Sequence, residues 1–456
     1  MESFYLDEFL IGKNCEEKQV KVSFEKLCGS IREEFIREWE NDRGDMHAAL
    51  QLQKRAIIGY ENEAAYFKEK IRDLIKKYGA GKTQYPPWYE NLTDAVYHEN
   101  WGLAGVAEWF TERYTDGSSV KIIGERIYFM DQGRMRLMRQ TISKDRREQL
   151  IRAFLLLTPE ERLDKEFHEI YLLDGTRITI FGGAMTKHEQ DVIIFRRYIV
   201  PNYTFEEQAA RGTIPEESIP LFCAMVECGF NVVFCGQVRS AKSTFLSTWQ
   251  SYEDPELEGV MIETDPEIPL HKLMPEAPIV QLIADNEKLM RISKNVLRSD
   301  ADYVIMAEAR DGNALDTAVR VASKGTRRMK ITFHCREPLD FPYDAAWEIA
   351  KATGSDIETT ARRVASAFDF VFHFVQLKNK NQKRLNSIYE LSVDRASGKI
   401  AMKQICAYDF QSDSWRWSSC ISRSKRNAGG EECYYGFLRF EEQLNMLAKT
   451  YPMEKQ

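Results

Sequence analysis

The sequence lacks the features that mark several specialised classes of protein. Its nine cysteines form no CxxC pair, which argues against zinc ribbons, and their odd number argues against a secreted disulfide scaffold. No basic stretch precedes an apolar one at the N-terminus, so secretion is not indicated. The 63 basic residues do not exceed the 70 acidic ones, and the net charge is -7. We therefore expect a reduced, cytoplasmic protein with no direct nucleic-acid partner.

Long hydrophobic runs are also scarce. Residues 219–238 come nearest to a membrane span, but they contain Glu227, Asn231 and a Gly229–Phe230 step at which a helical pattern becomes a strand pattern. Buried α/β core is the favoured interpretation. With 456 residues, 43% of them hydrophobic, the chain has room for about three globular domains of roughly 150 residues each.

The N-terminal part of the chain is predicted to be helical. Apolar residues step by three and four over residues 57–78, which predicts one long helix that ends at Gly79. Gly79-Ala-Gly-Lys-Thr83 looks like the tail of a phosphate-binding loop, but it follows a helix rather than a strand, so a helix C-cap is favoured. Prolines 86 and 87 then mark a connection. We expect a helical unit over residues 1–92.

Three further parts follow from changes in pattern. Short strands separated by Asp-Gly and Gly-Gly turns predict an α+β domain over residues 93–212. A capping-box pattern at Thr213–Glu216 opens residues 213–380, where short apolar runs alternate with helical patterns. This alternation predicts an α/β domain with a doubly wound, mostly parallel sheet. Residues 381–456 are expected to add hairpins and a final helix.

The most informative segment follows a predicted strand and precedes a predicted helix. A phosphate-binding loop needs inward-facing backbone N–H groups, a lysine that reaches phosphate oxygens, and a hydroxyl that ligates Mg²⁺. The strict G-x4-G-K-[ST] pattern fails at one position, so the loop alone does not exclude a chance match. The candidate loop residues are Gly236, Arg239, Ser240, Ala241, Lys242, Ser243 and Thr244, with Ser243 as the metal-binding hydroxyl.

A second motif supports the loop. Residues 302–307 form an apolar stretch that is followed by Glu308. A glutamate at such a strand end can polarise a water that attacks a γ-phosphate, although a single strand-end glutamate is more often only solvated. The loop and Glu308 together favour the functional interpretation.

The residues around Glu308 also resemble a known family. The chain reads Glu-Ala-Arg-Asp-Gly-Asn-Ala-Leu-Asp from Glu308 to Asp316, then has Gly325 and a Thr-Phe-His segment that ends at His334. This order is similar to that of the secretion and pilus-assembly ATPases, also called type II/IV secretion or traffic ATPases, over roughly residues 100–405. The branch that serves Tad/Flp pili and type IV secretion is the most similar.

The resemblance implies a RecA-like P-loop NTPase core that uses ATP and Mg²⁺. It also implies a ring-shaped homo-oligomer, in the family a hexamer, peripheral at the cytoplasmic membrane and acting on a polytopic inner-membrane platform protein. Glu263-Thr-Asp-Pro-Glu267 is similar to the acidic box of the family, and Arg196 and Arg197 lie in a segment whose arginines reach phosphates. Without the resemblance, these two arginines would read as a solvated strand edge. The implied catalytic residues are Glu308, Glu263, Glu267, His334, Arg196 and Arg197, with Ser243 and Glu263 as metal ligands.

Departures from the family pattern keep the function open. Arg239 and Ala241 stand where family loops have glycine, and Thr326 stands where the family has a histidine. If either loop position needs a positive φ, strain of about 1 kcal/mol would reduce nucleotide affinity, while Arg239 could add a phosphate contact. The leading hypothesis is an ATP-driven motor for a pilus or secretion apparatus. The alternatives are a nucleotide-binding or inactive ring subunit, and a small-molecule kinase, for which no acceptor signature is found.

Overall fold

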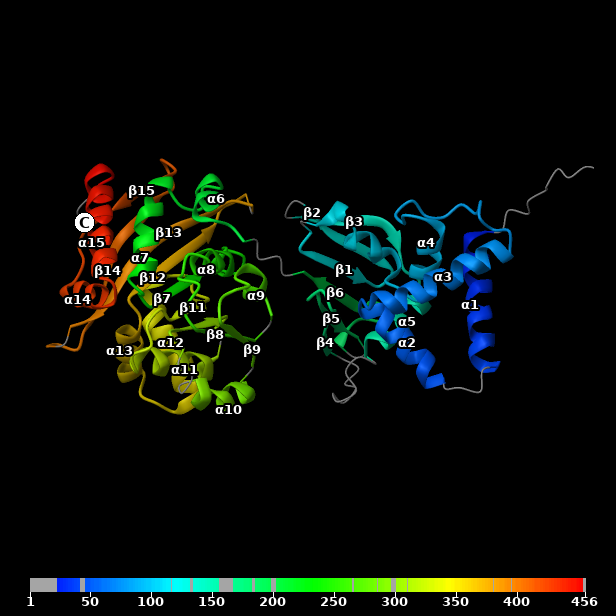
Figure 1. Cartoon of the computed structure of the whole chain (residues 1–456), viewed down its shortest axis with the longest axis horizontal. Helices are drawn as coiled ribbons and strands as arrows, with labels where there is room; N and C mark the ends of the chain where they lie inside the picture. Colours follow the sequence, from blue (N-terminus) through cyan, green and yellow to red (C-terminus); the bar gives the residue numbers. More distant parts are fainter. Residues whose placement is uncertain are drawn as a thin grey trace, which may run out of the picture. The chain divides into compact units, whose positions relative to one another are not determined.

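The structure, a computed structural model, forms two compact units, Met1–Arg197 and Tyr198–Gln456 (Figure 1). Each unit is described by itself. The described residues are 23–41, 46–115, 117–131, 134–155, 167–182, 185–197, 202–264, 266–284, 286–296, 301–309, 311–379, 381–394 and 396–453. No helix within these ranges combines the length and the apolar character that crossing a membrane requires.

The first unit begins with a bundle of helices. Amphipathic faces of these helices bury Phe35, Phe67, Ile71 and Trp101 in one cluster. The predicted single helix over residues 57–78 is wrong, because the chain breaks at Gly59, whose φ of 112° lies outside the helical region. Within the described residues the helices are α1 (Phe24–Asn41), α2 (Met46–Ile58), α3 (Glu61–Lys77) and α4 (Leu92–Asn100).

A six-stranded antiparallel sheet completes the first unit. The strand order is β3-β2-β1-β6-β5-β4, and alternate residues such as Ile122, Phe129 and Phe195 point into a core covered by α5 (Lys144–Leu155). Two 3₁₀ helices, Ala104–Phe110 and Glu112–Tyr114, precede the sheet. The strands are β1 (Ser119–Ile123), β2 (Arg126–Asp131), β3 (Arg134–Thr141), β4 (Phe167–Tyr171), β5 (Arg177–Phe181) and β6 (Val192–Arg196).

The second unit is built on a nine-stranded sheet of order β15-β14-β13-β12-β7-β11-β10-β8-β9. The six strands from β12 to β9 are parallel, and β13, β14 and β15 continue the sheet as antiparallel neighbours. The strands are β7 (Val232–Gly236), β8 (Gly259–Glu263), β9 (Ile279–Ile283), β10 (Tyr303–Ala307), β11 (Lys330–Phe333), β12 (Phe370–Gln376), β13 (Lys383–Val393), β14 (Ile400–Asp409) and β15 (Ser414–Trp417). The chain is therefore a mixed α/β protein.

Helices cover both faces of this sheet. Along β7, Val232 and Phe234 enter one core, whereas Val233 and Cys235 enter the other, as expected for side chains that alternate across a strand. One face carries α6 (Phe205–Ala210), α7 (Ile219–Glu227), α8 (Lys242–Gln250), α9 (Leu270–Leu273) and α15 (Tyr434–Thr450), and the other α10 (Asn286–Val296), α11 (Gly312–Ser323), α12 (Phe341–Thr353) and α13 (Ile357–Ala367) (Figure 1).

The observed boundaries differ from the predicted ones in two places. Phe205 of α6 packs in the core of the second unit, so this unit takes in residues that the sequence pattern assigned to the α+β domain. The predicted capping box at Thr213–Glu216 is wrong: α7 begins after Ser218, and the capping box lies instead at Thr204–Glu207. Residues 1–22 of the predicted helical unit lie outside the described residues. The four-part division of the chain remains a prediction.

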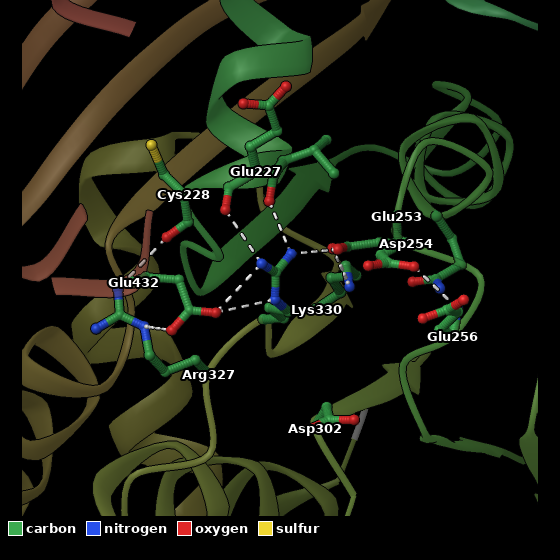
Figure 2. Close-up of polar contacts among 12 residues, drawn as sticks. Glu227, Cys228, Glu253, Asp254, Glu256, Asp302, Arg327, Lys330 and Glu432 are labelled. Atoms are coloured by element: carbon green, nitrogen blue, oxygen red, sulfur yellow. Dashed lines mark hydrogen bonds and ion pairs between the residues drawn. The ribbon is translucent and has the colours of Figure 1, made fainter. Parts of the chain in front are cut away.

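Ion pairs tie α14 (Arg423–Glu432) to the amino ends of the parallel strands (Figure 2). Arg328 lies 2.5 Å from Glu253 and 3.2 Å from Glu432, and Arg327 lies 3.5 Å from the second oxygen of Glu432. Lys330, which is fully buried, lies 2.7 Å from Glu253. These charges face partners of opposite sign, which is how buried charges are normally accommodated.

Candidate functional site

The candidate phosphate-binding loop joins the buried strand β7 to α8. Gly236 ends β7 with φ 143°, and a Cβ there would lie 2.2 Å from the carbonyl oxygen of Phe374 and 2.8 Å from Oγ of Ser240. Only glycine fits this position. Ser240 is fully buried, and its Oγ has no hydrogen-bond partner among the described residues. The loop thus holds one buried hydroxyl whose hydrogen-bonding capacity no described protein group satisfies.

The two loop positions that depart from glycine both have a left-handed backbone. Arg239 has φ 64° and Ala241 has φ 76°. A side chain in this region costs about 1–2 kcal/mol relative to glycine. Lys242 and Ser243 open α8 immediately afterwards, with Thr244 behind them in its first turn. The backbone is therefore strained at both positions, Arg239 and Ala241, for which the sequence alone left the sign of φ open.

Positive charges gather on the loop. Lys242 is buried, its Nζ donates to the Gln237 carbonyl at 2.8 Å, and it lies 3.4 Å from Nδ1 of His334. Lys383, at the start of β13, lies near Arg239, and its pKa is lowered first by burial and then by that guanidinium. Like charges held together in this way are stabilised by an anion. The sequence analysis missed Lys383 because nothing local to it signals that β13 returns beside the loop.

Carboxylates gather at the ends of neighbouring strands. Ser243 donates to Glu267 Oε2 at 3.3 Å, and Glu263 Oε1 accepts the backbone N–H groups of Glu267 and Ile268 at 3.1 and 3.0 Å. The pKa of Glu263 is raised to about 7, chiefly by burial; the two backbone hydrogen bonds oppose this shift, and the charges of Glu267 and Glu308 add to it. The structure thus brings Ser243, Glu263, Glu267 and Glu308 together at the carboxyl edge of the sheet.

Glu308 lies on a tight turn after β10. Its φ is 58°, and its backbone N–H donates to Thr332 Oγ1 at 2.7 Å. Strand β11, which carries Thr332, is inserted between β10 and the loop strand β7, so the hydroxyl fixes the turn from the neighbouring strand. A strained residue held by a side chain of this kind is common at functional sites. Thr332 is a second contributor that the sequence analysis did not assign.

Two histidines flank the loop strand. His334 follows β11 and contacts Lys242, while His373 of β12 is the cross-strand neighbour of Cys235. Burial, and then the charge of Lys242, lowers the pKa of His373 to about 4. His373 is therefore neutral at physiological pH and adds no charge to the cluster.

The donor set fits a magnesium–nucleotide complex. In the described part of the chain, no group of three or more His, Cys, Asp or Glu side chains could hold a metal ion by itself. Magnesium in nucleotide sites is held by one or two protein ligands together with phosphate oxygens and water, and Ser243 with Glu263 or Glu267 provides that number. The positive charges of the loop, and the Ser240 hydroxyl that has no partner among the described residues, are groups that suit binding of phosphates.

Arg196 and Arg197 differ in their surroundings within the first unit. Arg197 stacks on Trp109 at 4.1 Å and donates to the Tyr114 and Trp109 carbonyls at 3.2 Å each, so it braces its own unit. Arg196 is exposed and directly opposite Arg177 on β5. Only Arg196 is therefore available to a ligand in this conformation. Arg310 and Asp265, which belong to the predicted motifs, lie outside the described residues.

The rejected loop-like segment is a helix end. Lys77 is the last residue of α3, Gly79 has φ 61°, and its N–H donates to the Lys76 carbonyl at 3.0 Å. This is the predicted C-cap.

Comparisons with known proteins returned only distant structural likeness. No family model and no curated protein matches the chain. Among solved structures, the VirB11 ATPase from the Brucella suis type IV secretion system, in complex with sulphate, has 16% identity and a TM-score of 0.34 over 62% of this chain and 92% of that one. The pilus retraction motor PilT with bound ADP has 12% identity and a TM-score of 0.43, over 73% of this chain and 88% of that one. The Yersinia pseudotuberculosis ATPase DotB has 15% identity and a TM-score of 0.46, over 82% of this chain and 97% of that one. At these scores the likeness carries no functional argument.

Proposed function

We propose that this chain binds Mg²⁺-ATP and hydrolyses it. One observation carries the proposal. At one edge of a parallel sheet, a positively charged loop lies beside a cluster of negatively charged carboxylates. Each half holds like charges close together: Lys383 lies near Arg239, and Glu263 lies near Glu267 and Glu308. A polyphosphate with a divalent cation neutralises both halves at once.

Each residue then has a distinct task. The loop from Gly236 to Ala241 surrounds the phosphates with backbone N–H groups, and Lys242 provides a fixed positive charge for their oxygens. Ser243 and Glu263 hold the metal, which supplies charge neutralisation of the phosphates when bound. Glu308 orients the attacking water and Glu267 assists by positioning Ser243.

The wider role is inferred from the ordered motifs of the sequence. We assign the second unit to RecA-like P-loop NTPases, since β11 separates the loop strand from the strand that ends at Glu308, and the chain to the secretion and pilus-assembly ATPases of the Tad/Flp and type IV branch. In this role the chain is a cytoplasmic homohexamer, peripheral at the cytoplasmic membrane. It powers a pilus or secretion apparatus through a polytopic platform protein. The assignment of Arg196 to nucleotide phosphate remains a prediction.

A second candidate is a nucleotide-binding ring subunit without turnover. The positive φ angles of Arg239 and Ala241 favour it, because strain and the added Cβ atoms weaken the cradle. Thr326, which stands where the family has a histidine, does not support this second candidate. It precedes β11 and so lies at the opposite edge of the sheet from the loop of the same chain.

The test is ATP binding and phosphate release by the purified full chain with Mg²⁺. We expect Lys242→Ala to remove nucleotide binding and Glu308→Gln to retain it while reducing turnover about 100-fold or more. Lys403→Ala, an exposed lysine on β14, is the matched control and should change neither. Binding without turnover by the unmodified chain would support the second candidate, and a folded chain that binds no nucleotide would refute both.

A further inference from the structure

Helix α12 carries large apolar side chains on its exposed face. Its inner face buries Phe341 and Ile349 in the core of the second unit. On the outer face Trp347 is 53% exposed, and Tyr343 and Leu339, the latter in the short 3₁₀ helix before α12, are exposed to a similar extent. These three residues recur every four positions, which places side chains in one row along a helix. Aromatic side chains gathered on a surface are typical of protein–protein contacts.

A row of carboxylates runs beside the apolar row. Asp340, Asp344 and Glu348 also recur every four positions. The pKa of Asp344 is raised, first by burial and then by the charges of Asp340 and Glu348, so the three carboxylates lie close enough to repel one another. Lys351 pairs with Glu348 at 2.9 Å, but in the described part of the chain no basic side chain forms an ion pair with Asp340 or Asp344. The acidic face of α12, as we call these two rows together, therefore favours a partner that has both positive charge and apolar surface.

The first unit has a surface of this kind at one edge of its sheet. Strand β3 is the last strand on its side, and β2 is its one neighbour among the described strands. Arg134, Arg136 and Arg139 are exposed along β3, which contains no acidic residue. Leu137 between them is 61% exposed. Arg136 lies 3.2 Å from Asp131, but both side chains of this pair are exposed, so the pair is weak.

The two surfaces match in spacing as well as in charge. Residues four positions apart on a helix are separated by about 6 Å along its axis. Alternate residues of a strand, such as Arg134 and Arg136, are separated by about 6.6 Å. The carboxylates of the acidic face and the arginines of β3 can therefore face one another pair by pair.

We propose that the acidic face of α12 in one copy of the chain docks on β3 of a second copy. Tyr343 and Trp347 then pack against Leu137 and the apolar stems of the arginines. Because α12 and β3 are different surfaces, the contact is heterologous and repeats from copy to copy, which closes a ring or extends a filament. The inference rests on the homo-oligomer of the proposed function, but not on ATP hydrolysis.

The test reverses the charge on each surface and then mixes the two proteins. Asp344→Lys with Glu348→Lys makes the helix face positive, and Arg134→Glu with Arg136→Glu makes β3 negative. Each double variant alone then presents like charges at every contact. We expect its self-association, measured by sedimentation of the full chain over a range of concentrations without nucleotide, to weaken about 100-fold or more. In an equal mixture opposite charges face one another at every contact, so assemblies in which the two variants alternate should form.

Two further variants separate this contact from a general effect of charge. Glu431→Lys with Glu442→Lys reverses two exposed carboxylates of α14 and α15, and this matched control should associate like the unmodified chain. Trp347→Ala changes no charge, and we expect it to weaken association about tenfold.

Three outcomes would overturn the interface. They are an unmodified chain that stays monomeric at every concentration, double variants that associate as well as the unmodified chain, and rescue that requires all four reversals in one chain and fails in the mixture. ATP turnover by a chain that does not assemble would refute the interface and leave the proposed hydrolysis standing. Assembly with the expected charge dependence by a chain that binds no nucleotide would support the interface and refute the proposed hydrolysis.

Discussion

The two edges of the nine-stranded sheet treat buried charge in opposite ways. At the amino edge, Glu253 pairs with both Lys330 and Arg328. Glu432 pairs there with Arg327 (Figure 2). At the carboxyl edge, Glu263 lies near Glu267 and Glu308, and Lys383 lies near Arg239. The same sheet supports both arrangements, so the fold does not demand the second one. The carboxyl edge stores electrostatic repulsion that a ligand of mixed charge would relieve.

The backbone repeats this contrast. Arg239, Ala241 and Glu308 at the carboxyl edge all have positive φ. At the amino edge Arg328 also has positive φ, of 58°, but its guanidinium is bound by Glu253, Glu432 and the Val226 carbonyl. Strain at the amino edge is therefore compensated by contacts of the Arg328 side chain within the protein.

Breaking the amino edge should give the largest effect on stability. Glu253→Gln leaves Lys330 and Arg328 in the interior without their counter-charge, and we expect the free energy of unfolding to fall by about 3–5 kcal/mol. Urea unfolding of the full chain measures it. Glu432→Gln is the control, since its side chain is 27% exposed and the loss should be about 1 kcal/mol or less. Equal losses for the two variants would contradict the assignment of Glu253 as the central partner.

The same substitution at the carboxyl edge should act in the opposite direction. The pKa of Glu263 is raised from 4.5 to about 7 by burial and neighbouring carboxylates. Between these values the folded chain binds more protons than the unfolded chain, so stability falls as pH rises. Without divalent cations at pH 8, we expect Glu263→Gln to increase the free energy of unfolding by about 3 kcal/mol.

Two controls make this prediction specific. The stabilisation by Glu263→Gln should disappear near pH 4, where both states of the unmodified chain carry a protonated carboxyl. The variant should also lose Mg²⁺-dependent ATP hydrolysis, because Glu263 is a proposed metal ligand. A destabilised variant at pH 8 would show that the carboxylates do not repel one another as inferred.

His373 should give the chain an acid-sensitive step. Burial and the charge of Lys242 lower its pKa from 6.5 to about 4. Between pH 6.5 and pH 4 this histidine is therefore protonated in the unfolded chain but not in the folded chain. Stability falls by about 3 kcal/mol as the pH drops through this window. His373→Gln removes that contribution, and its unfolding free energy should change less between pH 7 and pH 4. Identical pH slopes for the two chains would exclude this role.

Sequence reasoning could group residues where the signal is local. Lys242, Ser243 and Glu308 were assigned because a strand, a loop and a helix follow one another within a few residues, and the structure places them at one edge. The ion pairs of Arg327 and Arg328 could not be predicted, because their partners Glu253 and Glu432 lie 75 to 105 residues away in the chain. The break at Gly59 was missed because the apolar spacing continues through it, whereas a single φ angle decides the structure.

The first unit shows the same limit. Arg196 and Arg197 are neighbours in the sequence, and no pattern distinguishes them. In the structure they point to different surroundings, one exposed and the other stacked on Trp109. Tertiary contacts that are distant in sequence thus decide which of two identical side chains can reach a ligand.

The smallest expected effect tests the strained loop directly. Ala241→Gly relieves a left-handed alanine, and we expect the unfolding free energy to rise by up to about 1 kcal/mol. Ala65→Gly in the exposed face of α3 is the matched control, and there the same change should cost about 1 kcal/mol. Opposite signs for the two variants would show that the backbone angle, rather than the methyl group, sets the energy. If Ala241→Gly and Arg239→Gly also tighten ATP binding, the departures from glycine reduce the affinity of a working site. If they stabilise the loop without changing binding, the strain belongs to the fold, and the carboxylates and Lys242 alone must account for any nucleotide affinity.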